Sequence, residues 1–301
     1  LNNPCQWHND LHMQVAHVYN AQGKHVGTIN ADRLLLLHRN FQHTANTKPH
    51  LHKNVNSFEA EIVQLLTRYK DGYKHINNLK EKTKLNNHWA TPDRYMEVIH
   101  NHFNTMHERF SSPLNYNPMH RVYWSMYERD TVFGASHNAF STPWQGKSQA
   151  NPEYESSDME KAIRWAIHST STPQPSTTVF VLPKWKYTTY RTWLQHNNVT
   201  EYCTVNRKFF PFKTGDHWHT TGNNAYAQDP KWDVKIFAVT NDPQFKTKTS
   251  IDNFKMHSTR QLQSGMATHL NASLSASSHS RKHHSGKVTP CHHHPPSLSS
   301  S

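Results

Sequence analysis

The tetrapeptide Asn151-Pro152-Glu153-Tyr154 combines residue types that could hold a flat polar ring in place for chemistry. The side-chain oxygen of Asn151 and the carbonyl oxygen of Pro152 can both accept hydrogen bonds from an amine. The ring of Tyr154 can stack on a nucleobase, which contributes on the order of 1–3 kcal/mol per base. Because Asn-Pro is also a common way to begin a turn, the tetrapeptide alone leaves an ordinary loop open.

The sequence around the tetrapeptide predicts a strand, a loop, a helix and a second strand. A short stretch ends at Ala150, and residues 177–182 are β-branched and apolar, with Pro175 before them and Pro183 after them. The helix between them is indicated by apolar residues that share one face: Met159, Ala162, Ile163, Ala166 and Ile167. Such units build mainly parallel sheets, which bind ligands at the carboxyl ends of their strands. We therefore expect Asn151 to Tyr154 at a ligand-binding edge.

Other segments complete an α/β prediction. A helix is predicted from about Asn56 to Tyr69, behind the possible N-cap Ser57, and a second from Thr91 through Phe103. We expect the apolar residues of both helices to pack in the core without contacting a ligand. Residues 234–239 predict a further strand, and residues 201–212 could supply its neighbour.

These patterns divide the chain into three predicted parts. Residues 1–90 form an N-terminal helical region, and residues 91–255 form an α/β domain. Residues 256–301 are rich in Ser and His and keep no periodicity, so we expect a disordered tail. Residues 291–294 of that tail read Cys-His-His-His, but they lack the paired spacing of a structural zinc site, and no metal site is predicted.

Charge and composition limit the classes of partner. The formal charge of +12 favours a polyanion such as RNA or DNA, although the basic residues of the tail could simply be solvated. Three cysteines suggest no disulfide framework, and the longest aliphatic run, residues 34–37, is far shorter than the roughly 20 residues of a membrane span. We expect a protein of a reducing compartment with no membrane partner. Because the chain begins with Leu1, an N-terminal part with any targeting peptide could be missing.

The tetrapeptide resembles the Asn-Pro-Pro-aromatic signature of amino methyltransferases, which modify exocyclic amines of adenine or cytosine. Such an amine is a poor nucleophile, because its lone pair is delocalised into the ring. Hydrogen bonds from its two N–H groups to the Asn151 oxygen and the Pro152 carbonyl would favour the pyramidal geometry that attacks a sulfonium methyl. The signature therefore implies catalysis by positioning and electrostatics, without a covalent intermediate.

Four further segments, in order along the chain, extend the resemblance to one family. They are Glu108-Arg109-Phe110-Ser111-Ser112-Pro113-Leu114-Asn115, Asp130-Thr131-Val132-Phe133-Gly134-Ala135, Gly146 to Pro152, and Val179 to Trp185. Together they resemble the catalytic domain of the cap-specific adenosine N6-methyltransferase family, also called the phosphorylated C-terminal-domain-interacting factor with a WW domain. The resemblance extends, with gaps, from about Ser57 to about Phe245, and includes Asn241-Asp242-Pro243.

The resemblance implies a Rossmann-like, S-adenosylmethionine-dependent methyltransferase sheet with an N-terminal helical extension. It assigns Asn151 and Pro152 to orienting the amine and Tyr154 to stacking on the base, and it leaves Trp185 open between packing and substrate contact. It places a further set of residues beside the S-adenosyl-L-methionine cofactor: Ser112, Pro113, Leu114, Asn115, Asp130, Phe133 and Gly134.

The resemblance also implies a substrate and partners. The expected substrate is N6 of a 2′-O-methyladenosine beside the 7-methylguanosine cap of mRNA, so the expected partner is RNA at a capped 5′ end, in the nucleus. No segment has the paired tryptophans and closing proline of a WW domain. Binding of the RNA polymerase II C-terminal domain is therefore expected only if a missing part of the protein carries that module.

Two departures from the family keep other functions open. Glu153 replaces the second proline of the signature, which removes a rigid φ and introduces a carboxylate. After Phe133-Gly134 the chain reads Ala135-Ser136-His137, with His137 where the family tends to have glycine. A catalytically inactive nucleic-acid-binding homologue is one alternative, and a DNA adenine methyltransferase of a mobile element is another.

Overall fold

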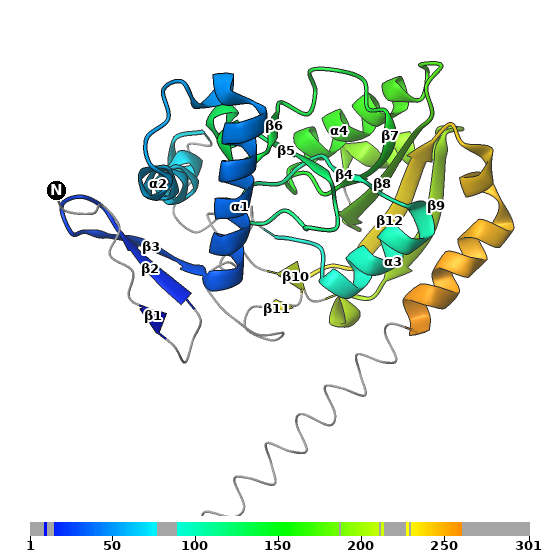
Figure 1. Cartoon of the computed structure of the whole chain (residues 1–301). Helices are drawn as coiled ribbons and strands as arrows, with labels where there is room; N and C mark the ends of the chain where they lie inside the picture. Colours follow the sequence, from blue (N-terminus) through cyan, green and yellow to red (C-terminus); the bar gives the residue numbers. More distant parts are fainter. Residues whose placement is uncertain are drawn as a thin grey trace, which may run out of the picture. The chain divides into compact units, whose positions relative to one another are not determined.

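The computed structural model of the chain describes residues 9–10, 15–76, 89–186, 188–210, 212–213, 227–228 and 230–260 (Figure 1). The described residues up to Ser258 belong to one compact unit. In that part of the chain, no helix is both long and apolar enough to cross a membrane.

A seven-stranded mixed sheet forms the centre of this unit, in the order β6-β5-β4-β7-β8-β12-β9 (Figure 1). Its strands are β4 (His107–Glu108), β5 (Val122–Ser125), β6 (Ser136–His137), β7 (Gly146–Ala150), β8 (Ser176–Pro183), β9 (Val199–Val205) and β12 (Val234–Thr240). Strands β4 to β8 pair in parallel, whereas β12 runs antiparallel to both β8 and β9. The mixed α/β sheet is compatible with a Rossmann-like methyltransferase fold, which confirms the predicted fold class.

The strand order changes direction at β4. From β4 the chain proceeds to β5 and β6 on one side, and then returns to β7 on the other side of β4. Ligands of open α/β sheets bind outside the carboxyl ends of the strands at such a switch point. The segments after β4 and β7, beginning at Arg109 and Asn151, meet there.

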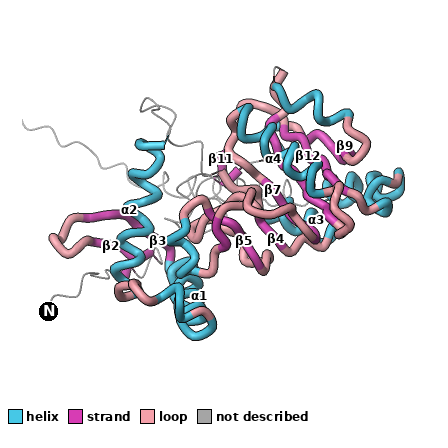
Figure 2. The backbone as a smooth tube through the Cα atoms, turned by 90° about the horizontal axis from the view of Figure 1, so that it is seen from above, coloured by secondary structure: helices cyan, strands magenta, loops and turns pink. Residues whose placement is uncertain are grey.

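The second half of the sheet is sandwiched between helices. Every residue of β8 is buried, and Phe180 and Leu182 share a core with the helix α4 (Ser156–Ser169). Figures 1 and 2 show the helix α3 (Asp93–Phe103) on the opposite face of the sheet. The helices predicted around residues 159–167 and 91–103 are therefore confirmed, as are the strands at 177–182 and 234–239. The segment 201–212 contributes part of β9.

The N-terminal part contains strands that the sequence did not predict. Strands β1 (Asn9–Asp10), β2 (Val15–Tyr19) and β3 (His25–Asn30) form an antiparallel sheet, followed by α1 (Ala31–Thr47), η1 (Pro49–His52) and α2 (Phe58–Ile76). The helix predicted at residues 56–69 is confirmed as α2. The remaining short elements are η4 (Glu128–Phe133), η5 (Thr189–Gln195), η6 (Arg207–Phe209), β10 (Phe212–Lys213), β11 (Ala227–Gln228) and η8 (Pro243–Lys246).

The N-terminal helices share a core with the loops of the large sheet. Ile62 and Leu65 of α2 are fully buried in one cluster with Leu114, from the β4–β5 connection, and Phe133, from η4. The segment 1–90 therefore packs directly against the edge where ligands are expected. The predicted division at residue 90 stays a prediction.

The expected disordered tail lies almost wholly outside the described residues. Residues 256–260 continue a helix that begins at residue 248, and residues 261–301 are not described. The Cys-His segment at residues 291–294 therefore lies outside the described part as well.

The shared core makes a stability prediction. Leu65→Ala removes a fully buried side chain from the cluster that joins α2 to Leu114 and Phe133. We expect the free energy of unfolding to fall by about 2–5 kcal/mol. The matched variant is Leu35→Ala, at a side chain that is 59% exposed, and it should change the free energy of unfolding by less than about 0.5 kcal/mol. Chemical denaturation followed by circular dichroism measures both, and equal losses would contradict the shared core.

Candidate active site

A cavity of about 460 Å³ lies at the switch point, outside the carboxyl ends of β4, β5, β6 and β7. Its volume falls within the roughly 300–1,000 Å³ of small-molecule sites. Its lining comes from these strand ends, from the start of α4, from α2 and from residue 89: Tyr69, Trp89, Arg109, Phe110, Ser111, Ser112, Asn115, Trp124, Ser125, Met126, His137, Asn138, Ala139, Phe140, Asn151, Pro152, Glu153, Tyr154 and Asp158. We call this cavity the edge pocket.

Asn151, the first residue after β7, is held by two hydrogen bonds. Its Nδ2 donates to the carbonyl oxygen of Trp89 over 2.8 Å, and the hydroxyl of Tyr154 donates to its Oδ1 over 2.7 Å. Because a carbonyl oxygen can only accept, the first bond fixes which end of the amide carries the oxygen. The second bond uses one lone pair of Oδ1, which leaves its other lone pair to accept a hydrogen bond from a ligand.

The ring of Tyr154 lies in a cluster of aromatic side chains. It makes edge-to-face contacts with Trp185, Phe212 and Trp232, at centroid distances of 6.5, 5.8 and 6.2 Å. Trp185 also contacts Trp232 and does not line the edge pocket, so its contacts here are packing contacts. Burial raises the pKa of Tyr154 well above its usual value. Its hydroxyl therefore keeps the proton that it donates to Asn151.

The two departures from the family motif both line the edge pocket. Glu153 lies between Pro152 and Tyr154, and His137 is exposed at the end of β6. Asp158, near the start of α4, adds a second carboxylate to the lining. Any ligand of the pocket therefore meets side chains that the family signature does not contain.

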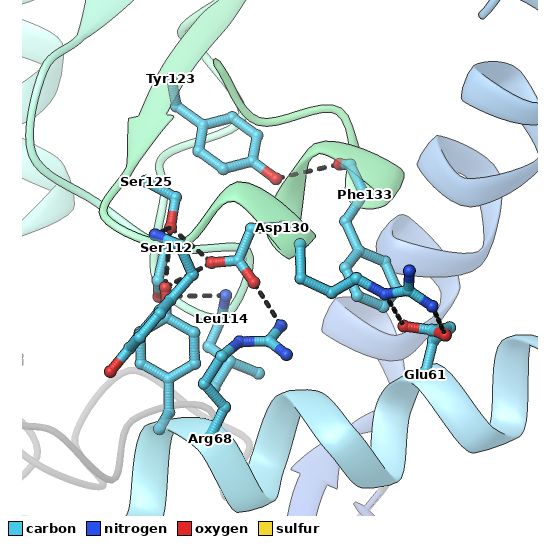
Figure 3. Close-up of polar contacts among 11 residues, drawn as sticks. Glu61, Arg68, Ser112, Leu114, Tyr123, Ser125, Asp130 and Phe133 are labelled. Atoms are coloured by element: carbon cyan, nitrogen blue, oxygen red, sulfur yellow. Dashed lines mark hydrogen bonds and ion pairs between the residues drawn. The ribbon is translucent and has the colours of Figure 1, made fainter. Parts of the chain in front are cut away.

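A buried carboxylate holds two hydroxyl side chains that line the pocket, and its contacts are drawn in Figure 3. Asp130 is fully buried and pairs with Arg68 of α2. It also accepts hydrogen bonds from the hydroxyl of Tyr69, over 2.5 Å, and from that of Ser125. A second ion pair, between Glu61 of α2 and Arg129, crosses the same interface with the charges reversed.

This network decides what the wall can offer a ligand. Tyr69 and Ser125 both line the edge pocket, whereas Asp130 does not. Because a carboxylate paired with arginine only accepts hydrogen bonds, both hydroxyls donate to Asp130. Their oxygens lie 2.9 Å apart, and Ser125 Oγ also accepts a hydrogen bond of 3.3 Å from the backbone N–H of Tyr127. Towards a ligand the two hydroxyls can therefore act only as acceptors. The wall therefore suits a ligand that donates hydrogen bonds, such as the hydroxyl groups of a ribose.

Arg109, the residue after β4, brings a buried positive charge to the pocket. Its guanidinium lies over the rings of Trp124 and Trp144, at 4.0 and 5.4 Å from their centroids, and its Nε donates to Ser148 Oγ over 2.8 Å. Burial lowers the pKa of Arg109 to about 9, so the group remains charged at neutral pH. No carboxylate among the described residues pairs with Arg109. A ligand that carries an anionic group would therefore be favoured beside it.

The residues predicted from the resemblance fall into two groups. Asn151, Pro152 and Tyr154 line the edge pocket together with Ser112 and Asn115, whose side chains hydrogen-bond each other over 2.9 Å. A second set does not line it: Pro113, Leu114, Asp130, Phe133 and Gly134. All of these roles stay predictions.

The second set has structural positions behind the pocket wall. Leu114 and Phe133 are fully buried in the core shared with α2, and Asp130 holds the hydroxyls of the wall. Gly134 ends η4 with a φ of 89°, a left-handed conformation that favours glycine. Pro113 is buried, and its carbonyl oxygen accepts a long hydrogen bond of 3.4 Å from Arg33.

Sequence reasoning gave no site role to several lining residues. Tyr69 was expected to pack only in the core, and its position three residues beyond the apolar pair Leu65 and Leu66 gives no other signal. Arg109 belonged to a motif but received no role. Its place directly after a strand could have identified it, but β4 is only two residues long and was not predicted.

A family model described as "Phosphorylated CTD interacting factor 1 WW domain" matches residues 34–210, more than half of the 301 residues. The matched segment runs from residue 34, within α1, to the residue after η6, and it contains every described residue that lines the edge pocket. The search among curated proteins found no match. Within the described residues, no group of three or more His, Cys, Asp or Glu side chains could hold a metal ion.

The buried network supports a second stability prediction. Asp130→Asn keeps the shape of the side chain but leaves Arg68 without its anion, and we expect a loss of about 3–5 kcal/mol in the free energy of unfolding. The same change at the exposed Asp252 should cost less than about 0.5 kcal/mol. Denaturant titration of both variants tests this, and an unaltered stability of Asp130→Asn would show that the network does not hold the wall.

Proposed function

The chain belongs to the family of the phosphorylated CTD interacting factor 1 WW domain, and from this premise we propose that it is an S-adenosylmethionine-dependent RNA adenine-N6 methyltransferase. The match agrees with the family resemblance of the ordered motifs. The observation that carries the proposal is the fixed amide of Asn151, whose Oδ1 is held at a pocket of ligand size at the switch point of the sheet.

The residues of the edge pocket fit S-adenosylmethionine. The hydroxyls of Tyr69 and Ser125 would accept hydrogen bonds from its ribose, and Ser112 and Asn115 would border it from the segment after β4. The charge of Arg109 suits its carboxylate. When bound, this cofactor supplies a methyl group on a positively charged sulfur.

The chain's own residues would position the amine. Oδ1 of Asn151 and the carbonyl oxygen of Pro152 would accept hydrogen bonds from the two N–H groups of the adenine N6. This directs the nitrogen lone pair away from the ring and towards the methyl group. The ring of Tyr154 would stack on the base, and its hydroxyl would hold Asn151 through the hydrogen bond to Oδ1. One side chain would therefore support both the base and the residue that orients its amine.

The finer identity of the substrate rests on family membership. We propose that the target is the 2′-O-methyladenosine beside the cap of mRNA, and that the protein acts in the nucleus. The charge of +12 supports a nucleic-acid substrate. Binding to the RNA polymerase II C-terminal domain would need a WW module elsewhere in the protein.

Glu153 and His137 support a second candidate, an inactive nucleic-acid-binding homologue. Both side chains line the edge pocket, where the family has proline and tends to have glycine. A carboxylate beside the sulfonium would stabilise its charge before transfer consumes it, and this does not lower the barrier of the chemical step.

The test is transfer of a labelled methyl group from S-adenosylmethionine to capped RNA that begins with 2′-O-methyladenosine. The parent should transfer label, and Asn151→Ala should be slower by about a hundredfold or more, because it removes the acceptor for the amine. Asn197→Ala, at an exposed loop residue, is the matched control and should keep the parent rate. A DNA oligonucleotide of the same sequence separates an RNA enzyme from a DNA enzyme, because only RNA offers the 2′-oxygen.

Calorimetric binding of S-adenosylhomocysteine and the variant Glu153→Pro separate the remaining candidates. If the parent transfers no label and Glu153→Pro does, the protein is an enzyme that was inactivated at that position. If neither protein transfers label and S-adenosylhomocysteine does not bind detectably, the proposal is contradicted and the nucleic-acid-binding homologue is favoured.

A further inference from the structure

Beyond the end of β8 lie two adjoining hollows with basic linings. Their volumes are about 290 and 370 Å³, and both are lined by Arg191, Leu194 and Lys235. Lys184 and Lys186 line the smaller one. We call the surface formed by Lys184, Lys186, Arg191 and Lys235 the basic groove.

The fold brings these cations together from three elements. Lys184 and Lys186 follow β8, Arg191 belongs to η5, and Lys235 belongs to β12, paired with Leu182 of β8. The backbone N–H of Lys184 donates to the carbonyl oxygen of Asp233 over 2.7 Å, and Nη1 of Arg191 donates to the carbonyl oxygen of Lys186 over 3.0 Å. These bonds fix the backbone from which the side chains of Lys184 and Lys186 extend, and they hold the guanidinium of Arg191 next to it.

The groove has an excess of positive charge. Lys184, Lys186 and Arg191 are exposed, and Glu201, which lines the larger hollow, pairs with Lys235 over 2.7 Å. Among the described residues, neither Lys184 nor Arg191 forms an ion pair. From residue 184 to residue 213 the sequence contains no acidic residue except Glu201. Such a surface attracts an extended anion.

The groove is linked to the edge pocket through one pair of aromatic side chains, Trp185 and Tyr154. Lys184 and Lys186 flank Trp185, whose ring contacts that of Tyr154 at a centroid distance of 6.5 Å. Tyr154 lines the edge pocket and is the proposed support of the target base. A strand that places one base in the pocket could therefore lay neighbouring phosphates over the cations behind Trp185.

We propose that the basic groove binds the phosphate backbone of the single-stranded RNA that carries the target adenine. The inference rests on the proposed function in one respect, the choice of RNA as the polyanion. A base must leave its duplex before a pocket can enclose it, which favours a single strand at the pocket mouth. The two hollows share Arg191, Leu194 and Lys235 and therefore adjoin, which suits several phosphates rather than one.

The experiment measures RNA binding without any cofactor, so that its result does not depend on methyl transfer. The probe is a short, uncapped, fluorescein-labelled single-stranded RNA, followed by fluorescence anisotropy at several salt concentrations. The variant is Lys184→Ala/Arg191→Ala, and the matched control is Lys53→Ala/Lys248→Ala, which removes two exposed cations elsewhere. A third variant, Lys184→Arg/Arg191→Lys, keeps the charge.

We expect the groove variant to bind about 25-fold more weakly at about 0.1 M salt, since each phosphate contact with a single strand contributes about fivefold there. The slope of log K against log salt should fall in magnitude by about 1.4. The control and the charge-retaining variant should bind as the parent does. Unchanged thermal unfolding midpoints would exclude loss of the fold as the cause.

Several results would overturn the assignment. Equal losses in the groove variant and the control would show attraction by net charge alone, and no loss in either would show that RNA binds elsewhere. Two further probes, the same RNA with a cap and the same RNA in a duplex, complete the comparison. A loss seen only with the capped probe would assign the groove to the triphosphate of the cap, and equal binding of the duplex would reject the single strand. If the groove variant loses RNA binding as expected but the parent transfers no methyl group, the groove's role in RNA binding is kept and the proposed function is rejected.

Discussion

The pair of crossed ion pairs between α2 and the segment 128–133 is the constraint on which the site depends. Arg68 and Glu61 of α2 face Asp130 and Arg129, and both carboxylates are fully buried. Buried charges of this kind need their partners, since removal of one leaves the other uncompensated in the interior. The pairing fixes the position of α2 against the sheet, and with it Tyr69. The same carboxylate, Asp130, orients the hydroxyls of Tyr69 and Ser125, so one interaction both joins the parts and defines a wall of the pocket.

The other walls follow from sheet topology. Reversal of the strand order at β4 brings the ends of β4 and β7 together, and the residues there are Arg109 and Asn151. Asn151 gains a fixed orientation from Trp89, and a hydrogen bond from Tyr154 three residues later. The pocket thus combines a positive charge, a directed amide oxygen and two accepting hydroxyls. This set suits a ligand with a carboxylate, a ribose and a nearby amine.

Local patterns predicted the second half of the sheet, because β8, β12 and α4 have strong periodicity and clear breakers. The same patterns located Asn151 at a strand end without knowledge of the sheet order. The N-terminal strands were missed, since β2 and β3 are short and carry histidines among their apolar residues. Tyr69 could not be assigned to the pocket because its partner Asp130 is 61 residues away in sequence. Leu114 and Phe133 show a further limit, because a motif identifies a segment near a ligand without saying which side chains turn into the core.

The central claim is that the N-terminal helix α2 is part of the ligand site, held there by Asp130. Hydrogen–deuterium exchange with and without S-adenosylhomocysteine tests it most directly, because protection is read for each segment of the chain. The ligand should slow exchange in residues 58–69 of α2 as well as in the segments that follow β4, β5 and β7. Slower exchange in the sheet segments alone, with α2 unchanged, would contradict the account and make the N-terminal part a separate extension.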